Sequence, residues 1–284
     1  MSDPRWVPVS RERHGDRFWC RFSSYGFARR RRHVPVVPGE LAQVAAALPV
    51  LFFDDGTGPA PVALLRLAAE GVSALVAENG VWLGVYVPAA LRVHPFSAEE
   101  TDGGRMTLLV DEASGLITEA PEHERFFTDE GAPAPALEEV VAFFRRHAAS
   151  ARAGRAACAA LAGRGLLSPF VPPEGIAMPD AERYLALDRA RFEALDDDDV
   201  LAMHRAGALG VAHAHLISLA HLRFLAHVER RAAVSADRIP APTAAPAAQE
   251  RLAGFLDALA DARADENTVE LDEMMRPCKG NGES

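Results

Sequence analysis

The strongest constraint on the fold of this chain is a change of sequence pattern near residue 135. Before this point, short apolar runs are separated by turn signals, such as DDGTGP after VLFF (50–53) and Asn79-Gly80 between two further runs. After it, apolar residues recur at helical spacing, as in 137–144. The sequence therefore predicts an α+β fold, with a mainly antiparallel sheet in the N-terminal half and a helical C-terminal half.

Several elements can be placed more closely. WVPVS (6–10) alternates and predicts an edge strand, because its proline removes a ladder donor. PGELAQVAAAL (38–48) predicts a short helix with a proline in its first turn. A long helix is expected from about residue 135, with an interruption near Gly154. Further helices are expected to begin at Asp188 and at Asp196, because aspartate is a favoured N-cap.

The C-terminal part of the chain has a different composition. Residues 1–231 are predicted to form the folded domain, and 232–249 are rich in alanine and proline, which is typical of a linker. A short amphipathic helix is expected over 251–263, followed by an acidic and then glycine-rich end without fixed structure. The prediction is therefore a flexible C-terminal extension, in which Cys278 is accessible.

Charge and cysteine usage narrow the function classes. The net charge of −10 argues against nucleic acid and anionic lipid as partners, because both need a basic surface. Three widely spaced cysteines, Cys20, Cys158 and Cys278, form no CxxC pattern and indicate a reducing compartment. Neither the apolar core of a signal peptide nor a run of about 18–20 apolar residues is visible. We therefore expect a cytoplasmic protein without a membrane span.

The stretch VWLGVYVPAALRVHPF (81–96) contains the candidate binding residues. In a strand, its aliphatic residues at odd positions face the core, and Trp82, Gly84 and Tyr86 face the other side. The missing side chain at Gly84 leaves a slot between two rings, which can admit a ligand, a peptide backbone or another strand of the same fold. Arg92 needs a partner, and Asp111 is the candidate. In the alternative interpretation, the rings pack under a loop and Arg92 holds the turn.

The stretch WLGVYVPAALRVHPF (82–96) and the following LLVDEASGLITE (108–119) resemble the SapC family. Three further segments resemble the same family: VPVVPGELAQVAAALPVLF (34–52), FFTDEGAPAPALEEVVAFF (126–144) and AHLISLAHL (214–222). The resemblance covers roughly residues 5–231. It is carried most specifically by the segment from the tryptophan to the final Pro-Phe.

Members of this family are bacterial proteins named after a gene found in a surface-layer locus. The resemblance implies no catalytic residue that can be transferred to this chain. Members often lie beside outer-membrane receptors, flavin-dependent tryptophan halogenases and cupin-like hydroxylases, which implies an accessory or substrate-related role. His94 departs from the family pattern, which commonly has an aromatic residue such as tyrosine there, and this argues against histidine chemistry at that position.

Other clusters of polar residues give weaker signals. The histidines at 213, 215, 221 and 227 lack the i, i+3 or i, i+4 spacing that aims two imidazoles at one ion, so we interpret them as structural or surface residues. The basic run Arg29–Arg32, followed by His33, is interpreted as a solvated edge strand, although it could also hold a phosphate, a carboxylate-rich peptide or an acidic partner. No GxSxG, P-loop or GxGxxG motif is present. Cys158 is expected to be buried and inert.

These observations lead to one preferred function and two alternatives. The preferred hypothesis is a non-catalytic binding or accessory protein that needs no cofactor and recognises a peptide or protein partner. Its binding surface is the face around Trp82, Gly84, Tyr86, Arg92 and Asp111. One alternative is that the tail near Cys278 is a substrate presented to a modifying enzyme. The other is a metal-dependent or hydrolytic enzyme whose site is assembled only in the fold.

Overall fold

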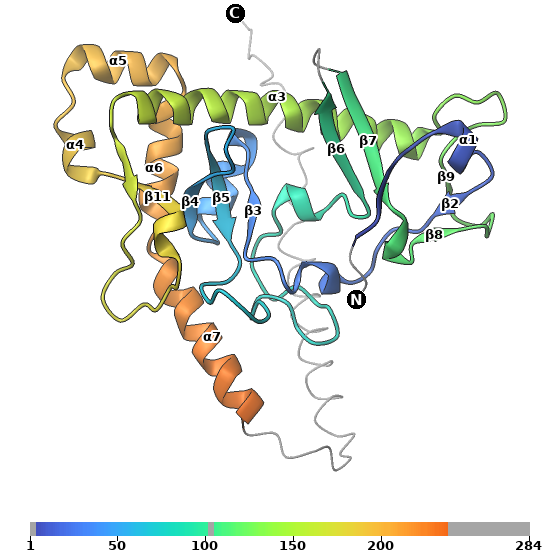
Figure 1. The fold of residues 1–284 in the computed structure, drawn as a ribbon, viewed down its shortest axis with the longest axis horizontal. Coiled ribbons are helices and arrows are strands. Elements are labelled where there is room, and N and C mark those ends of the chain that lie inside the picture. Colours follow the sequence, from blue (N-terminus) through green and yellow to red (C-terminus); the bar gives the residue numbers. More distant parts are fainter. Residues whose placement is uncertain (1–3, 102–104, 238–284) are drawn as a thin grey trace, which may run out of the picture. The chain divides into compact units, whose positions relative to one another are not determined.

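The computed structural model describes residues 4–101 and 105–237 (Figure 1). The strands are β1 (Trp6–Pro8), β2 (Phe18–Trp19), β3 (His33–Pro35), β4 (Val50–Asp54), β5 (Pro59–Leu64), β6 (Phe96–Thr101), β7 (Arg105–Asp111), β8 (Ile117–Thr118), β9 (Glu124–Arg125), β10 (Leu167–Pro169) and β11 (Tyr184–Leu187). The helices are α1 (Arg11–His14), α2 (Leu41–Ala45), α3 (Pro135–Gly163), α4 (Arg189–Glu193), α5 (Asp197–Arg205), α6 (Ala208–Ser218) and α7 (His221–Asp237). Short 3-10 turns are η1 (Tyr25–Ala28), η2 (Pro38–Glu40), η3 (Ala89–Leu91), η4 (Glu112–Ser114) and η5 (Ala181–Arg183).

The fold is α+β, with antiparallel sheets mainly in the N-terminal half and helices mainly in the C-terminal half. The chain divides into two units, Met1–Val234 and Ser235–Ser284. The predicted linker, the 251–263 helix and Cys278 lie outside the described residues.

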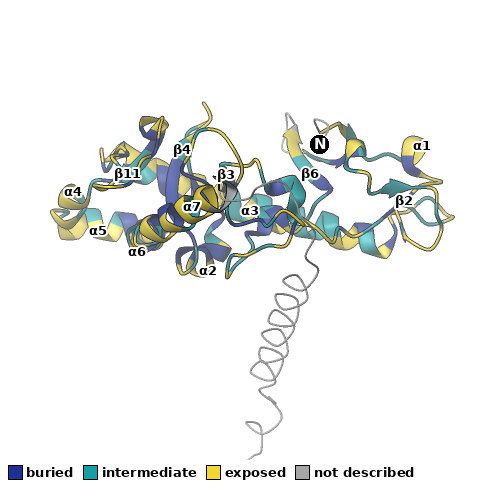
Figure 2. Ribbon diagram, turned by 90° about the horizontal axis from the view of Figure 1, so that it is seen from below, coloured by how far each residue is buried: buried dark blue, intermediate teal, exposed yellow. Residues whose placement is uncertain are grey.

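The largest sheet has the strand order β10-β11-β4-β5-β3, and its neighbours pair antiparallel. Strands β4 and β5 form the hairpin predicted from the turn signal DDGTGP. The carboxylate of Asp54 accepts hydrogen bonds from the amides of Gly56 at 2.8 Å and Gly58 at 3.0 Å. Both glycines have positive φ angles, of 99° and 108°, which explains why glycine occupies these positions. The first three residues of β4 are buried, as the dark blue ribbon in Figure 2 shows.

Two smaller antiparallel sheets lie away from the main one, with strand orders β1-β7-β6 and β8-β2-β9. Strand β1 is an edge strand, as predicted, and pairs with β7 through the register Trp6 to Asp111. Strands β6 and β7 form an antiparallel hairpin, in which Phe96 is opposite Val110.

The long helix α3 joins two apolar clusters. Its 29 residues span about 44 Å. Ala157, Cys158 and Leu161 near its C-terminal end belong to the main core, which includes β4 and β5. Leu137 near its N-terminal end belongs to a second cluster, whose buried members are Trp19, Phe96, Val110, Phe126 and Leu137. Figure 1 shows α3 running past the main sheet and the β6–β7 hairpin.

The predicted interruption of this helix at Gly154 is wrong. Helix α3 is continuous from Pro135 to Gly163. Gly154 is buried, and a Cβ atom there would lie 3.0 Å from Cδ of Pro38. Glycine therefore lets η2 pack closely against the helix without breaking it.

The C-terminal half also contributes strands. The C-terminal half was expected to be helical, but Tyr184 and Leu185 of β11 pair with Phe53 and Phe52 of β4. Predicted N-caps are confirmed at Asp188, which accepts from the amide of Arg191, and at Asp196, which accepts from Asp199.

His215 connects this part of the sheet to α6. Its Nδ1 lies 2.7 Å from the carbonyl of Val50, and its Nε2 accepts from the amide of Leu187 at 3.2 Å. The ring is therefore a neutral imidazole that donates to β4 and accepts from β11. Burial lowers the pKa of His215 to about 4. His213, by contrast, is exposed on α6.

The basic run Arg29–Arg32 is not the edge strand that the sequence predicted. It forms a turn, and β3 begins only at His33. Arg32 is half-buried and donates to the carbonyls of Leu67 and Pro179. Because the backbone turns here, the arginines do not alternate between two faces of a sheet.

Within 4–101 and 105–237, no single helix is both long and apolar enough to cross a membrane. The helix segments Ala208–Ser218 and His221–Val234, bent by 42°, together satisfy that test of length and composition.

Candidate functional site

The stretch 81–87 is not the strand that its alternating pattern predicted. It makes only one β-bridge, between Val76 and Trp82, after the predicted turn at Asn79-Gly80. The predicted burial is reversed. Val85 is 80% exposed, whereas Trp82 and Tyr86 are partly buried and pack against the main core.

The predicted slot over Gly84 is filled by the side chain of Trp82. The indole of Trp82 lies along the residues that follow it in the chain, and its Nε1 donates a 3.1 Å hydrogen bond to the carbonyl of Tyr86. A Cβ atom on Gly84 would lie 2.7 Å from that nitrogen. Glycine is therefore needed to make room for the protein's own tryptophan, and the slot does not exist as an open recess.

Tyr86 and Arg92 converge on a buried acid that the sequence reasoning did not select. Oε2 of Glu40 accepts hydrogen bonds from the hydroxyl of Tyr86 at 3.0 Å and from the amide of Ala89 at 2.7 Å. Arg92 donates to the Tyr86 hydroxyl at 3.1 Å, and its guanidinium lies 3.9 Å from Glu40. We call Glu40, Tyr86, Ala89 and Arg92 the Glu40 latch. It joins η2 to η3, so two segments that carry the family resemblance meet here.

The predicted pair between Arg92 and Asp111 is wrong. Asp111 instead accepts from the amides of Arg5 at 2.8 Å and Ala113 at 3.0 Å, so its carboxylate ties the ends of β1 and β7. Backbone amides next to the strand ends donate to this carboxylate, so it does not need a guanidinium as its partner. The role of Trp82, Gly84, Tyr86, Arg92 and Asp111 in partner binding stays a prediction.

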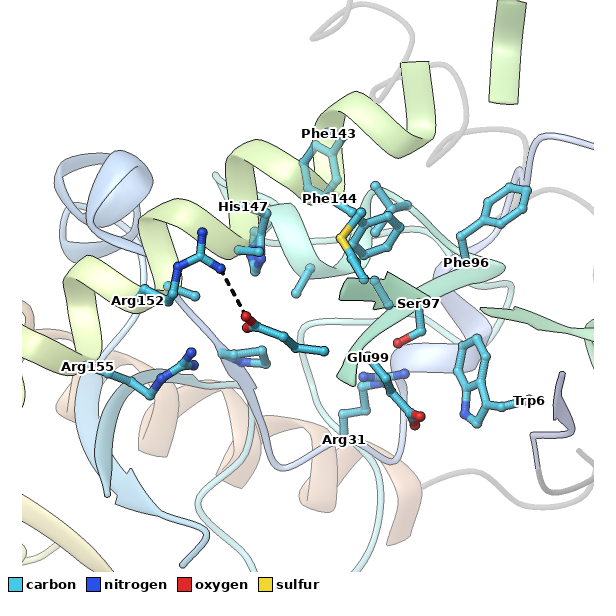
Figure 3. Close-up of a pocket in the computed structure, with 18 residues that line it drawn as sticks. Trp6, Arg31, Phe96, Ser97, Glu99, Phe143, Phe144, His147, Arg152 and Arg155 are labelled. Carbon is cyan, nitrogen blue, oxygen red and sulfur yellow. Dashed lines mark hydrogen bonds and ion pairs between the residues drawn. The ribbon is translucent and has the colours of Figure 1, made fainter. Parts of the chain in front are cut away.

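A cavity of about 500 Å³ lies between α3 and β6, and we call it the α3–β6 pocket (Figure 3). Its walls also include Ala90, which lies between the latch residues Ala89 and Arg92, and Val93, which follows Arg92. The latch thus fixes the segment that closes one side of the pocket. A cavity of this size is within the range that holds a small ligand or a few residues of a peptide.

Three arginines make the pocket wall cationic at two places. Arg152 and Arg155 of α3 lie together, and Arg31 of the basic run lies apart from them, toward Glu99 and Trp6 (Figure 3). Arg152 lies 3.4 Å from Glu100 of β6. Within the described residues, neither Arg31 nor Arg155 forms an ion pair. The pocket thus carries three guanidinium groups and two carboxylates, Glu99 and Glu100, in a chain whose net charge is −10.

The other part of the wall is apolar and aromatic. Phe96, Met106, Phe143 and Phe144 line it, together with Trp6, which is 37% exposed. Phe96 is buried, whereas the rings of Phe143, Phe144 and Trp6 remain at least partly exposed and supply contact area for a partner at a low cost in side-chain entropy.

His147 lies on the α3 wall and stacks on Phe143 at a centroid distance of 5.5 Å. Burial lowers the pKa of His147, and the charge of Glu40 partly opposes this effect. Nε2 of His147 and Oε1 of Glu40 are both buried, and neither has a hydrogen-bond partner within the described residues. Buried polar atoms are normally satisfied, so these two atoms identify a polar spot next to the pocket.

A smaller cavity of about 260 Å³ shares the lining residues Val93 and Phe96 with the α3–β6 pocket. His94 lines it and stacks on Phe27 at 3.9 Å. Burial lowers the pKa of His94 to about 4, although the charge of Asp111 opposes the shift. His94 is thus a neutral ring within a group of aromatic side chains, which suits a position where the family commonly has an aromatic residue.

Sequence reasoning missed the α3 side of the pocket. Phe143, His147, Ala151 and Arg155 recur every four residues and share one helix face, and this spacing was visible in the sequence. The opposing wall could not be found in that way, because β6 meets α3 only in the tertiary structure.

The described residues contain no group of three or more His, Cys, Asp or Glu side chains that could hold a metal ion. They therefore offer no metal centre for the enzymatic alternative. The substrate-tail alternative involves Cys278, which lies outside them. Cys158 is buried, as predicted, and burial raises the pKa of its thiol to about 12.

Comparison with known protein families gives a match that covers most of the chain. The model of the SapC family matches residues 9–225, which include the latch and all of the pocket lining except Trp6. No curated protein and no solved structure matches the chain. Because the family match covers most of the sequence, the chain belongs to the SapC family.

Proposed function

We propose that this protein is a non-catalytic binding or accessory protein, and that a segment of a peptide or protein partner occupies its α3–β6 pocket. The observation that carries the proposal is the pocket wall itself. Two guanidinium groups without an ion-pair partner and the at least partly exposed rings of Phe143, Phe144 and Trp6 line the same cavity of about 500 Å³. Arginine and aromatic residues are enriched where proteins recognise other proteins.

The surroundings of the pocket support a binding role. Its walls come from α3, from the β6–β7 hairpin and from the segment that follows the Glu40 latch. Helices and strands place a binding surface more accurately than loops do, because their backbones are held by internal hydrogen bonds. In this interpretation, Trp82, Gly84, Tyr86 and Arg92 support the pocket wall and need not contact the partner.

Affinity capture with matched arginine variants tests this function. The tagged protein, the double variant Arg31→Gln/Arg155→Gln and the control Arg146→Gln are used to capture proteins from the native cell. Arg146 is an exposed arginine of the same helix that does not line the pocket.

A partner retained by the wild type and by Arg146→Gln, but lost from the double variant, supports the proposal. Equal capture by all three proteins would show that the partner binds elsewhere. Circular dichroism and thermal unfolding check that the variants are folded, which we expect because both substituted side chains are exposed.

A further inference from the structure

The α3–β6 pocket combines two chemistries that a single peptide residue can satisfy together. We infer that it binds a carboxylate carried next to an apolar side chain, as at the free C-terminus of a peptide that ends in an apolar or aromatic residue. This inference rests on the proposed function and names the part of the partner that is recognised.

The cationic wall supplies donors for the carboxylate. A guanidinium presents five N–H donors in a planar fork that matches the two oxygens of a carboxylate. Arg31 and Arg155 have no acidic partner at ion-pair distance within the described part of the chain. Hydrogen bonds from Thr57 are the main cause of the lowered pKa of Asp55, which lies outside the pocket lining, and the charge of Arg155 adds to this effect.

Arg31 is the better placed of these two arginines to gain from an anion. The residue as a whole stays exposed, yet desolvation of its guanidinium lowers the pKa of Arg31. A partly desolvated cation without a counter-ion gains more from an arriving carboxylate than a fully hydrated cation does.

The acids on the rim limit the charge of the ligand. Glu99 and Glu100 reduce the three positive charges of the pocket to an excess of one. A single carboxylate matches that excess, whereas a phosphate dianion or a run of acidic residues would bring further negative charge close to the two glutamates. The pocket is thus suited to a monoanion.

The apolar wall places the neighbouring side chain of the ligand. Phe144 and Met106 come from α3 and β7, and Trp6 lies at the edge of the same cavity (Figure 3). The residue that bears the carboxylate can therefore direct its side chain toward these groups while its charge faces Arg31, which lies on the side of the pocket nearer Trp6. An amidated C-terminal residue would lose the interaction with the arginines, and a polar one would lose the contact with the apolar wall.

Calorimetric titration with two pairs of synthetic peptides tests the inference. The first pair is tetra-alanyl-phenylalanine with a free C-terminus and the same peptide as its C-terminal amide. The second replaces the terminal phenylalanine by serine, again as acid and amide. We expect the phenylalanine acid to bind at least about tenfold more tightly than the other three, because only this peptide offers both charge and apolar area.

Protein variants assign that preference to the pocket. Arg31→Gln/Arg155→Gln should reduce the preference for acid over amide to about twofold or less, while Arg146→Gln should leave it unchanged. Phenyl phosphate is the competing probe for a dianion. Equal affinity for acid and amide, an unchanged preference in the double variant, or tighter binding of phenyl phosphate than of the phenylalanine acid would each overturn the inference.

The inference and the proposed function fail in different ways. If the peptide acids do not bind, but capture of a cellular partner still depends on the two arginines, the partner is recognised through another chemistry and the proposed function stands. If the phenylalanine acid binds as expected, but no cellular protein or peptide is captured through the pocket, the carboxylate site is correct and the proposed function is wrong.

Discussion

The hydroxyl of Tyr86 donates a 3.0 Å hydrogen bond to the buried carboxylate of Glu40. The same oxygen accepts from the backbone of Ala89, so one acid fixes both the aromatic motif and the turn that follows it. Burial and the Glu40 carboxylate both raise the pKa of Tyr86, which keeps the phenol protonated and able to donate. The contact joins the glutamate that follows Pro-Gly to a tyrosine 46 residues later in the chain.

Removing the Tyr86 hydroxyl should destabilise the protein. Tyr86→Phe keeps the ring but leaves the buried carboxylate of Glu40 with one donor fewer, so we expect the free energy of unfolding to fall by about 1–2 kcal/mol. Urea unfolding followed by circular dichroism measures the change. Val85→Ala is the neighbouring control, because Val85 is 80% exposed and its truncation should cost less than about 0.5 kcal/mol. An unchanged midpoint for Tyr86→Phe would contradict the role of the latch.

Adding a methyl group at Gly84 should also destabilise the fold. The new Cβ atom would lie 2.7 Å from Nε1 of Trp82, so the indole must leave its place and lose its bond to Tyr86. We expect Gly84→Ala to cost about 1–3 kcal/mol, in the range of overpacked sites.

A second variant identifies the cause of that cost. In a Trp82→Leu background, the methyl group no longer meets an indole, so Gly84→Ala should cost clearly less than in the wild type. Equal costs in both backgrounds would show that the glycine is needed for another reason. If Gly84 instead bordered an open slot, Gly84→Ala would leave stability unchanged in the wild type.

Stability should depend on pH through His215. Its pKa is about 4 in the folded protein and about 6.5 in an unfolded chain. Between these values the unfolded chain binds a proton that the folded protein excludes. The contribution of neutral His215 is therefore complete above pH 6.5 and is lost as the pH falls toward 4, which amounts to about 3 kcal/mol.

The comparison of His215→Gln with the wild type measures this dependence. The variant should be less stable at pH 7, because the bonds to Val50 and Leu187 are altered, but its stability should fall less between pH 6.5 and 4.5. His213→Gln, on the exposed face of the same helix, should follow the wild type. Parallel pH profiles for His215→Gln and the wild type would contradict the assignment.

The described cysteines should differ in reactivity. Burial raises the pKa of Cys158 to about 12, so almost no thiolate is present at neutral pH, and the side chain is shielded as well. Brief alkylation with iodoacetamide followed by peptide mass spectrometry should label the partly exposed Cys20 and spare Cys158 until denaturant is added. Labelling of Cys158 in the native protein at the rate of Cys20 would show that α3 opens readily.

Local signals in the sequence predicted much of the fold. The hairpin turn near Asp54, the edge strand β1 and the caps at Asp188 and Asp196 depend on a few neighbouring residues, and the structure confirms all of them. Strand β11 was missed, because it is only four residues long and pairs with a strand about 130 residues earlier. Propensity within a window cannot show such a pairing.

The candidate site was harder to predict for the same reason. Alternation at 81–87 correctly indicated two faces. The aromatic side chains pack inward, however, so the residues that remain exposed are Val81, Leu83 and Val85. The Glu40 latch depends on one buried acid reaching a tyrosine across the fold. The cationic wall needs Arg31 and α3 to come together, which no local pattern encodes.

Site-specific photo-crosslinking tests the central claim, that a partner occupies the α3–β6 pocket, most directly. A photoreactive phenylalanine analogue is placed at Ala148, which lines the pocket, or at the adjacent exposed Ala149, which does not. Irradiation in the native cell should give one discrete crosslinked species from position 148, absent from position 149 and lost in Arg31→Gln/Arg155→Gln. The same crosslinked product from both positions, or a product from 148 that survives the arginine changes, would contradict the account.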